Sequence, residues 1–281
     1  MTEPTILLSG LGIPESPRWH DGRLWFCNWI DQQIVAVSPD GTPEYRPAPD
    51  QPSMGWSIDW LPDGRLLTTG DKLRRHEPDG SVVVHAEQGG NEIVVDGRGN
   101  TYVNGADFDF AGGEAPKPGY IKLVTPDGTV RQVADDIQFP NGMVITPADR
   151  TLIIAESFAG RLTAFDIDPD GGLSNRRVFA EGLGPDGICL DAEGAIWVSA
   201  ADSSIVRVAE GGEILQRVEL TESQSSFALA LGGPDRRTLF ILTAEWRPAD
   251  SIADNLDRLI NGPRTGAVLT LPVTVPGVGR P

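Results

Sequence analysis

Short apolar runs recur along the chain in one pattern. In residues 185–198, Asp186 is followed by an apolar run at 188–190, turn residues at 191–194 and a second apolar run that ends at Val198. Turn residues between two apolar runs predict a β-hairpin. Similar units begin at Glu15, Ser57, Asn91, Asn141, Asp186 and Phe227.

The spacing of these six units predicts the fold class. Their starting positions give a period of about 40 residues, the size of a four-stranded propeller blade. We therefore predict an all-β fold, a six-bladed β-propeller with four-stranded antiparallel blades, formed by residues 1–281 as a single domain. A β-sandwich with many hairpins is the alternative, but a sandwich has no reason to repeat one pattern six times at near-constant spacing.

The two ends of the chain carry apolar segments, 4–9 and 266–273. A ring of blades has to close without exposed edges. We predict that the N-terminal strand pairs into the last blade and closes the ring.

Two insertions interrupt the repeats, at 104–119 and 245–264, and both are candidates for lids over a site. Ile252, Leu256 and Leu259 in the second insertion have helical spacing, and Ser251 with Asp254 resembles a capping box. We expect a short helix there.

The first residues of the repeats point to a site. Equivalent positions of propeller blades meet around the central channel, so Glu15, Asn91, Asn141 and Asp186 are predicted to lie in one ring. Asn-Gly and Asp-Gly pairs usually mark turns, but the shared repeat position favours a site. Two carboxylates and two carboxamides make an oxygen-rich cage that suits a hard divalent cation.

Composition narrows the range of partners. The net charge of −17 argues against nucleic acid and anionic membranes as partners. No apolar run approaches the ~20 residues of a membrane span, and the N-terminus does not read as a secretory signal. We expect a cytoplasmic protein in which Cys27 and Cys189 are buried free thiols.

Other catalytic constellations do not fit the sequence. His20, His76 and His85 occupy no ring position, so a Ser-His-Asp hydrolase is not predicted. Zinc-type cysteine or histidine pairings and a glycine-rich phosphate loop are absent from the sequence as well.

Three motifs resemble one family. ESPRW (15–19), PNG (140–142) and GPDG (184–187) are similar to motifs of the regucalcin, gluconolactonase and luciferin-regenerating-enzyme family. The resemblance implies a propeller that binds one divalent cation, with Glu15, Asn141 and Asp186 as metal ligands. It also implies that Asn91 contacts the substrate or a metal-bound water.

Members of this family are typically lactone hydrolases, so the resemblance implies a divalent-metal-dependent lactonase whose substrate is a small lactone or ester. Calcium is the first expectation, with zinc, magnesium or manganese as alternatives. We expect Asp186 to be the catalytic base and Glu15 to anchor the metal. The open alternatives are a phosphotriesterase or lyase reaction on the same cage, and a non-catalytic calcium-binding propeller.

One departure from the family affects the expected substrate. Its sugar-lactonase members tend to have an arginine two residues before the position of Asn91, where this chain has Gly89. Aromatic residues lie near the expected blade ends, and we expect Trp56, Phe108 and Phe139 to bind substrate. An aromatic mouth favours a substrate more apolar than an aldonolactone.

Overall fold

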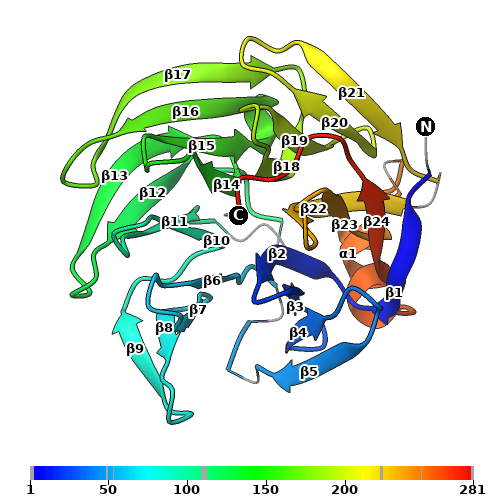
Figure 1. Ribbon diagram of the computed structural model, residues 1–281, viewed down its shortest axis with the longest axis horizontal. Helices are drawn as coiled ribbons and strands as arrows, with labels where there is room; N and C mark the ends of the chain where they lie inside the picture. The colour runs from blue at the N-terminus through cyan, green and yellow to red at the C-terminus, as the bar shows by residue number, and fades with distance from the viewer. Residues whose placement is uncertain are drawn as a thin grey trace.

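Six four-stranded antiparallel sheets surround a central channel in the computed structural model of this chain (Figure 1), which confirms the predicted fold class. The structure describes residues 3–48, 50–52, 54–108, 113–221, 224–247 and 249–279. In chain order, each blade begins with its innermost strand. The innermost strands pack side by side in sequence order, and the last, in blade 6, packs beside the first, in blade 1.

The strands of the blades have the following bounds. Blade 1 contains β2 (Pro14–His20), β3 (Arg23–Asn28), β4 (Gln33–Val37) and β5 (Pro43–Pro47). Blade 2 contains β6 (Ile58–Trp60), β7 (Leu66–Thr68), β8 (Leu73–His76) and β9 (Val82–Ala86). Blade 3 contains β10 (Glu92–Val95), β11 (Thr101–Gly105), β12 (Gly119–Val124) and β13 (Val130–Ile137). Blade 4 contains β14 (Pro140–Ile145), β15 (Thr151–Glu156), β16 (Arg161–Ile167) and β17 (Leu173–Glu181). Blade 5 contains β18 (Pro185–Leu190), β19 (Ile196–Ala200), β20 (Ser204–Val208) and β21 (Ile214–Glu219). Blade 6 contains β22 (Gln224–Gly232), β23 (Thr238–Glu245), β24 (Gly266–Pro272) and β1 (Thr5–Leu11).

The N-terminal strand closes the ring as predicted. β1 pairs antiparallel with β24, from Thr5 opposite Thr270 to Leu11 opposite Gly266. Blade 6 is therefore built from both ends of the chain, and β1 covers the edge that β24 would otherwise expose.

The hydrophobic core lies between neighbouring blades. One cluster joins Ile153 and Leu162 of blade 4 to Ile188 and Val206 of blade 5. Because blades cover both faces of one another, the second strands of blades 1 and 4, β3 and β15, are nearly continuous apolar runs. Cys27 in β3 and Cys189 in β18 are buried free thiols, as expected.

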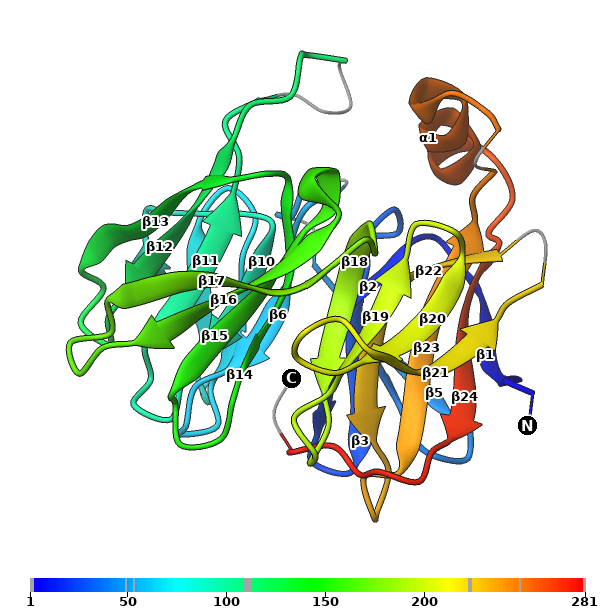
Figure 2. The same ribbon diagram turned by 90° about the horizontal axis from the view of Figure 1, so that it is seen from above.

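Both insertions leave the blades on the same side of the ring (Figure 2). The first joins β11 to β12, and its residues 109–112 lie outside the described part of the chain. The second carries α1 (Ile252–Asn261), which confirms the expected helix, and the Ser251 hydroxyl accepts the Asp254 N–H at its start. A 3₁₀ turn, Ser157–Ala159, follows β15 on blade 4. Among the described residues, no helix is long and apolar enough to cross a membrane.

Candidate active site

The predicted ring residues meet at one end of the channel. Glu15, Asn91, Asn141 and Asp186 all line a single cavity of about 700 Å³. The remaining two repeats begin at Ser57 and Phe227. Phe227 also lines this cavity, whereas Ser57 is fully buried and does not. Repeat position therefore predicted a spatial cluster from residues far apart in the sequence.

Irregular strand pairing turns the ring side chains toward the cavity. The register between an inner strand and its neighbour shifts after Glu15 in β2, after Pro140 in β14 and after Pro185 in β18. A β-bulge of this kind bends the strand and redirects a side chain. The bulges thus give three separate blades the same local geometry at the ring.

A glycine after the ring residue brings neighbouring inner strands together. A Cβ on Gly142 would lie 2.8 Å from the Ile188 nitrogen and 3.0 Å from the Asp186 carbonyl oxygen. A Cβ on Gly187 would lie 2.5 Å from Cα of Ala228. The Asn-Gly and Asp-Gly pairs therefore serve close strand packing here, and not turns.

The site concentrates negative charge. Burial, together with the charge of Glu92, raises the pKa of Asp186 to about 7, and a hydrogen bond with Asn141 opposes this rise. Burial also raises the pKa of Glu15, with further contributions from Asp186 and Glu92. The carboxylates thus repel one another in a confined space.

Sequence reasoning missed a charged cluster beside the ring. Arg18 Nη2 donates to Glu92 Oε1 at 2.9 Å and to the Ile93 carbonyl at 2.6 Å, and Arg18 Nε lies 3.7 Å from Asp59. All three charged side chains are buried. The available signal was a charged residue within the inner strand of each of three consecutive blades.

The residues at the ring fit a divalent cation. No ion pair to lysine or arginine involves Glu15 or Asp186 among the described residues. The buried Asn104 Oδ1 has no hydrogen-bond partner, while its Nδ2 donates to the Asn141 carbonyl at 2.7 Å. A hard cation would offset the repulsion between the carboxylates and would be coordinated by carboxylate and carboxamide oxygens.

The oxygen atoms available to a cation at the ring come from both carboxylate and carboxamide side chains. Within the described ranges, no group of three or more His, Cys, Asp and Glu side chains is arranged to hold a metal. A cation at this ring would therefore depend on the Asn141 oxygen beside the carboxylates of Glu15 and Asp186.

The aromatic predictions had different outcomes. Phe108 and Phe139 line the cavity, but Trp56 does not. The Trp56 side chain has no exposed area and packs with Trp25 and Ile58 in the core between blades 1 and 2. Its carbonyl instead accepts a 2.6 Å hydrogen bond from Nε1 of Trp29, a residue that does line the cavity.

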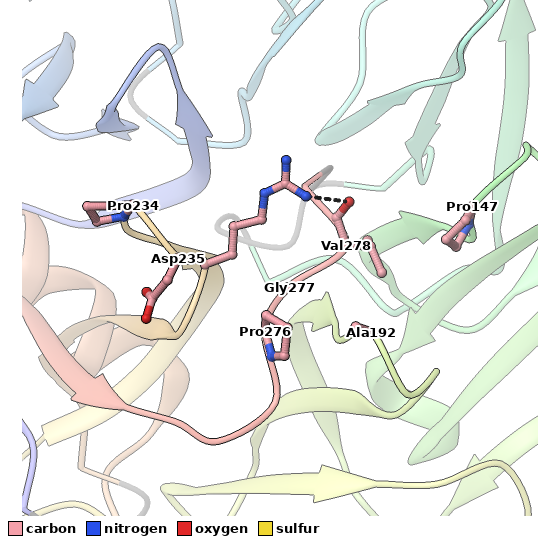
Figure 3. A pocket seen from close by; sticks show the side chains of 8 residues that line it. Pro147, Ala192, Pro234, Asp235, Pro276, Gly277 and Val278 are labelled. Atoms are coloured by element: carbon pink, nitrogen blue, oxygen red, sulfur yellow. Dashed lines mark hydrogen bonds between the residues drawn. The ribbon is translucent and has the colours of Figure 1, made fainter.

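A second hollow, of about 580 Å³, lies at the opposite end of the inner strands (Figure 3). The C-terminal segment crosses there, with Ala192 donating its N–H to the Pro276 carbonyl and Arg236 donating to the Val278 carbonyl. Asp235 and Arg236 are the charged residues of its described lining. This hollow lacks the paired carboxylates of the channel mouth.

Comparisons with known proteins agree with the fold and motifs. Residues 13–245 match the model of the SMP-30/Gluconolactonase/LRE-like region. The chain belongs to this family.

Individual relatives extend the match over the whole chain. The chain is 27% identical to pentonolactonase XacC of Haloferax volcanii, over 100% of this chain and 97% of the relative. It is 29% identical to regucalcin of Oryctolagus cuniculus, over 82% of each. The solved structure of a calcium-binding protein, regucalcin, from Agrobacterium tumefaciens superposes with a TM-score of 0.80 at 21% identity, covering 100% of this chain and 96% of that one.

Proposed function

We propose that this protein is a divalent-metal-dependent lactonase. The observation that carries the proposal is the cluster of Glu15, Asn141 and Asp186 around one cavity, with two carboxylates that form no ion pair among the described side chains. Relatives named pentonolactonase and lactonase drp35, the latter from Staphylococcus aureus, support the same reaction class.

The reaction requires a polarised ester carbonyl, a water that loses a proton, and a stabilised negative charge on oxygen. A bound divalent cation, calcium first, supplies Lewis acidity at the carbonyl. Zinc, magnesium or manganese would supply the same chemistry. The three ring side chains offer oxygen atoms for the ion, and the cavity holds the lactone beside them.

We assign different roles to the two carboxylates. Glu15 is buried and accepts the Ser16 N–H at 3.0 Å, so its position suits a fixed metal ligand. Asp186 is partly exposed to the cavity. It is therefore the group placed to take a proton from an attacking water and to return it to the leaving alkoxide. Asn91 also lines the cavity, and we assign it a contact with the substrate.

A second candidate function is calcium binding without catalysis. A solved structure of similar fold is described as a calcium-binding protein. The cavity beside the ring favours the enzyme. Its volume of about 700 Å³ is that of a pocket for a small-molecule ligand, and an ion alone would not need this space.

A panel of lactones assayed with calcium and with a chelator tests the proposal. We expect hydrolysis that chelation abolishes and that calcium restores, and we expect Asp186→Asn to lower kcat by about 10²–10⁴-fold. Asp170→Asn, an exposed carboxylate in the turn after β16, is the matched control and should retain activity. Calcium binding without hydrolysis of any lactone would favour the second candidate function.

A further inference from the structure

We propose that the site takes lactones with a large apolar substituent, bound between two facing walls of aromatic and aliphatic side chains, in preference to polyhydroxylated sugar lactones. This inference rests on the proposed lactonase function. It concerns the substrate class, which the carboxylate ring itself does not specify.

The first wall comes from blades 3 and 4. The rings of Phe139 and Phe158 stack at 4.3 Å between centroids, with 17° between their planes, and Phe108 lies 5.9 Å from Phe139. Phe139 has a φ of 58°, which is rare for a bulky residue. The fold therefore holds this ring at the cavity at some cost in backbone strain.

The second wall comes from blade 6 and its insertion. Phe227 and Trp246 meet edge to face at 6.1 Å. Helix α1 adds Leu256 and Leu259, which are both buried and line the cavity, and Leu259 packs in one cluster with Phe227 and Trp246. Because the acidic residues of α1, Asp254 and Asp257, are exposed, the helix presents an apolar side to the cavity and a charged side outward.

The two walls face each other across the channel. In a ring of six blades, the blade 3 insertion that carries Phe108 lies three positions from blade 6, on the opposite side, and blade 4, which carries Phe158, lies two positions from blade 6. Figure 2 shows the two insertions rising from the same face on either side of the channel opening. A flat apolar group bound above the carboxylate ring would contact both walls.

Polar groups for sugar hydroxyls are scarce in the described lining. Outside the ring residues, the polar side chains of the lining are three serines, and each hydroxyl has a partner within the protein. At 2.7 Å each, these pairs are Ser157 with the Pro185 carbonyl, Ser225 with Ser203, and Ser226 with Ser199. No lysine, arginine or histidine lines the described cavity. A substrate with several hydroxyls would find few hydrogen-bond partners on these walls beyond the ring residues, which weakens binding.

The backbone also excludes a cationic side chain at position 89. A Cβ on Gly89 would lie 2.0 Å from the Gly70 carbonyl oxygen and 2.4 Å from the Asp71 carbonyl carbon. Any side chain there would require the backbone of blade 2 to move. The backbone at Gly70 and Asp71 therefore leaves no room for a side chain at position 89, and this position supplies no polar group for substrate recognition.

The cavity volume agrees with a substituted substrate. About 700 Å³ lies in the range of pockets for drug-sized ligands, and a monosaccharide lactone would fill only part of it. Burial of an aromatic group between the walls changes affinity by roughly 10- to 100-fold.

The test compares kcat/KM for dihydrocoumarin, an alkyl-substituted δ-lactone and glucono-δ-lactone. We expect the two apolar lactones to exceed the sugar lactone by at least roughly tenfold. Preference for glucono-δ-lactone would overturn the inference and leave the proposed lactonase function intact.

Variants test the walls directly. Phe158 is 50% exposed, so Phe158→Ala should fold and should raise KM for dihydrocoumarin by roughly tenfold while KM for glucono-δ-lactone changes little. Tyr45→Ala, on the outer strand β5 and 47% exposed, is the matched control and should change neither constant. Equal effects of Phe158→Ala on both substrates would contradict the proposed wall.

A binding measurement separates this inference from the function on which it rests. 2-Tetralone is a carbocyclic, non-hydrolysable analogue of dihydrocoumarin, and its affinity can be followed by calorimetry. We expect it to bind, and to bind roughly tenfold more weakly to Phe158→Ala. If it binds in this way while no lactone is hydrolysed, the apolar site stands and the lactonase proposal fails. If it does not bind, or binds Phe158→Ala equally well, the inference fails.

Discussion

Replacing Asp186 with asparagine should change activity and stability in opposite directions. Asparagine keeps the size and one oxygen of Asp186 but cannot accept a proton. A general base contributes about 10²–10⁴-fold in rate, so kcat for a lactone should fall by about that factor while metal still binds. That loss corresponds to roughly 3–5 kcal/mol in the activation barrier.

The stability effect follows from the charges around Asp186. Its pKa of about 7 in the fold, against an ordinary value of 3.8, means that the folded chain disfavours the ionised form. This cost is absent below pH 4, grows as pH rises from 4 to 7, and is then constant. At about 1.4 kcal/mol per pKa unit the full shift corresponds to about 4 kcal/mol, and screening by solvent at this partly exposed group reduces the cost to roughly 3 kcal/mol. The metal-free Asp186→Asn protein should therefore melt several degrees higher than the parent at pH 8, and at the same temperature at pH 4.

The assay is a pair of measurements on the same samples: lactone hydrolysis with saturating calcium, and melting in chelator at pH 4 and pH 8. Asp170→Asn serves as the control for both, because its carboxylate is exposed. Full recovery of Asp186→Asn activity by added metal would reduce Asp186 to a ligand and refute its role as base. Lower stability of the variant at pH 8 would refute the account of charge repulsion.

Three further predictions concern the ring and its surroundings. Glu15→Gln should weaken metal affinity, seen as activity that recovers at high calcium concentration; an activity loss that calcium never restores would contradict the anchoring role. Calcium should raise the melting temperature more at pH 8 than at pH 5, because protons hold Asp186 neutral at pH 5 and compete with the ion; an equal rise at both values would contradict this. Arg18→Met should lower the free energy of unfolding by about 3–5 kcal/mol in denaturant titrations, because it leaves Glu92 and Asp59 buried without their cation. The control Arg23→Met breaks an exposed pair with Glu44 and should lower it by less than about 1 kcal/mol.

Much of the fold follows from local sequence features. Hairpin signals at a constant period determine the blades, the apolar segments at both ends predict the closure by β1, and the spacing around Leu256 predicts α1. The ring was predictable for the same reason, because repeat position alone brings Glu15 and Asp186 to one cavity.

The remaining features depend on contacts between blades, which no local pattern contains. Arg18 of blade 1 forms an ion pair with Glu92 of blade 3, and this pair depends on how the blades are arranged around the channel. Trp56 was predicted to bind substrate because it lies near an expected blade end. Packing turns its side chain into the core and leaves Trp29 at the cavity.

The central claim is that Glu15, Asn141 and Asp186 hold one divalent cation in the channel. Diffraction from crystals grown with calcium, with anomalous data to identify the ion, tests it most directly. The account predicts one calcium ion per chain, with an oxygen of each of these three side chains about 2.3–2.6 Å away. A channel without an ion at saturating calcium, or a calcium ion bound elsewhere in a chain that hydrolyses lactones, would contradict it.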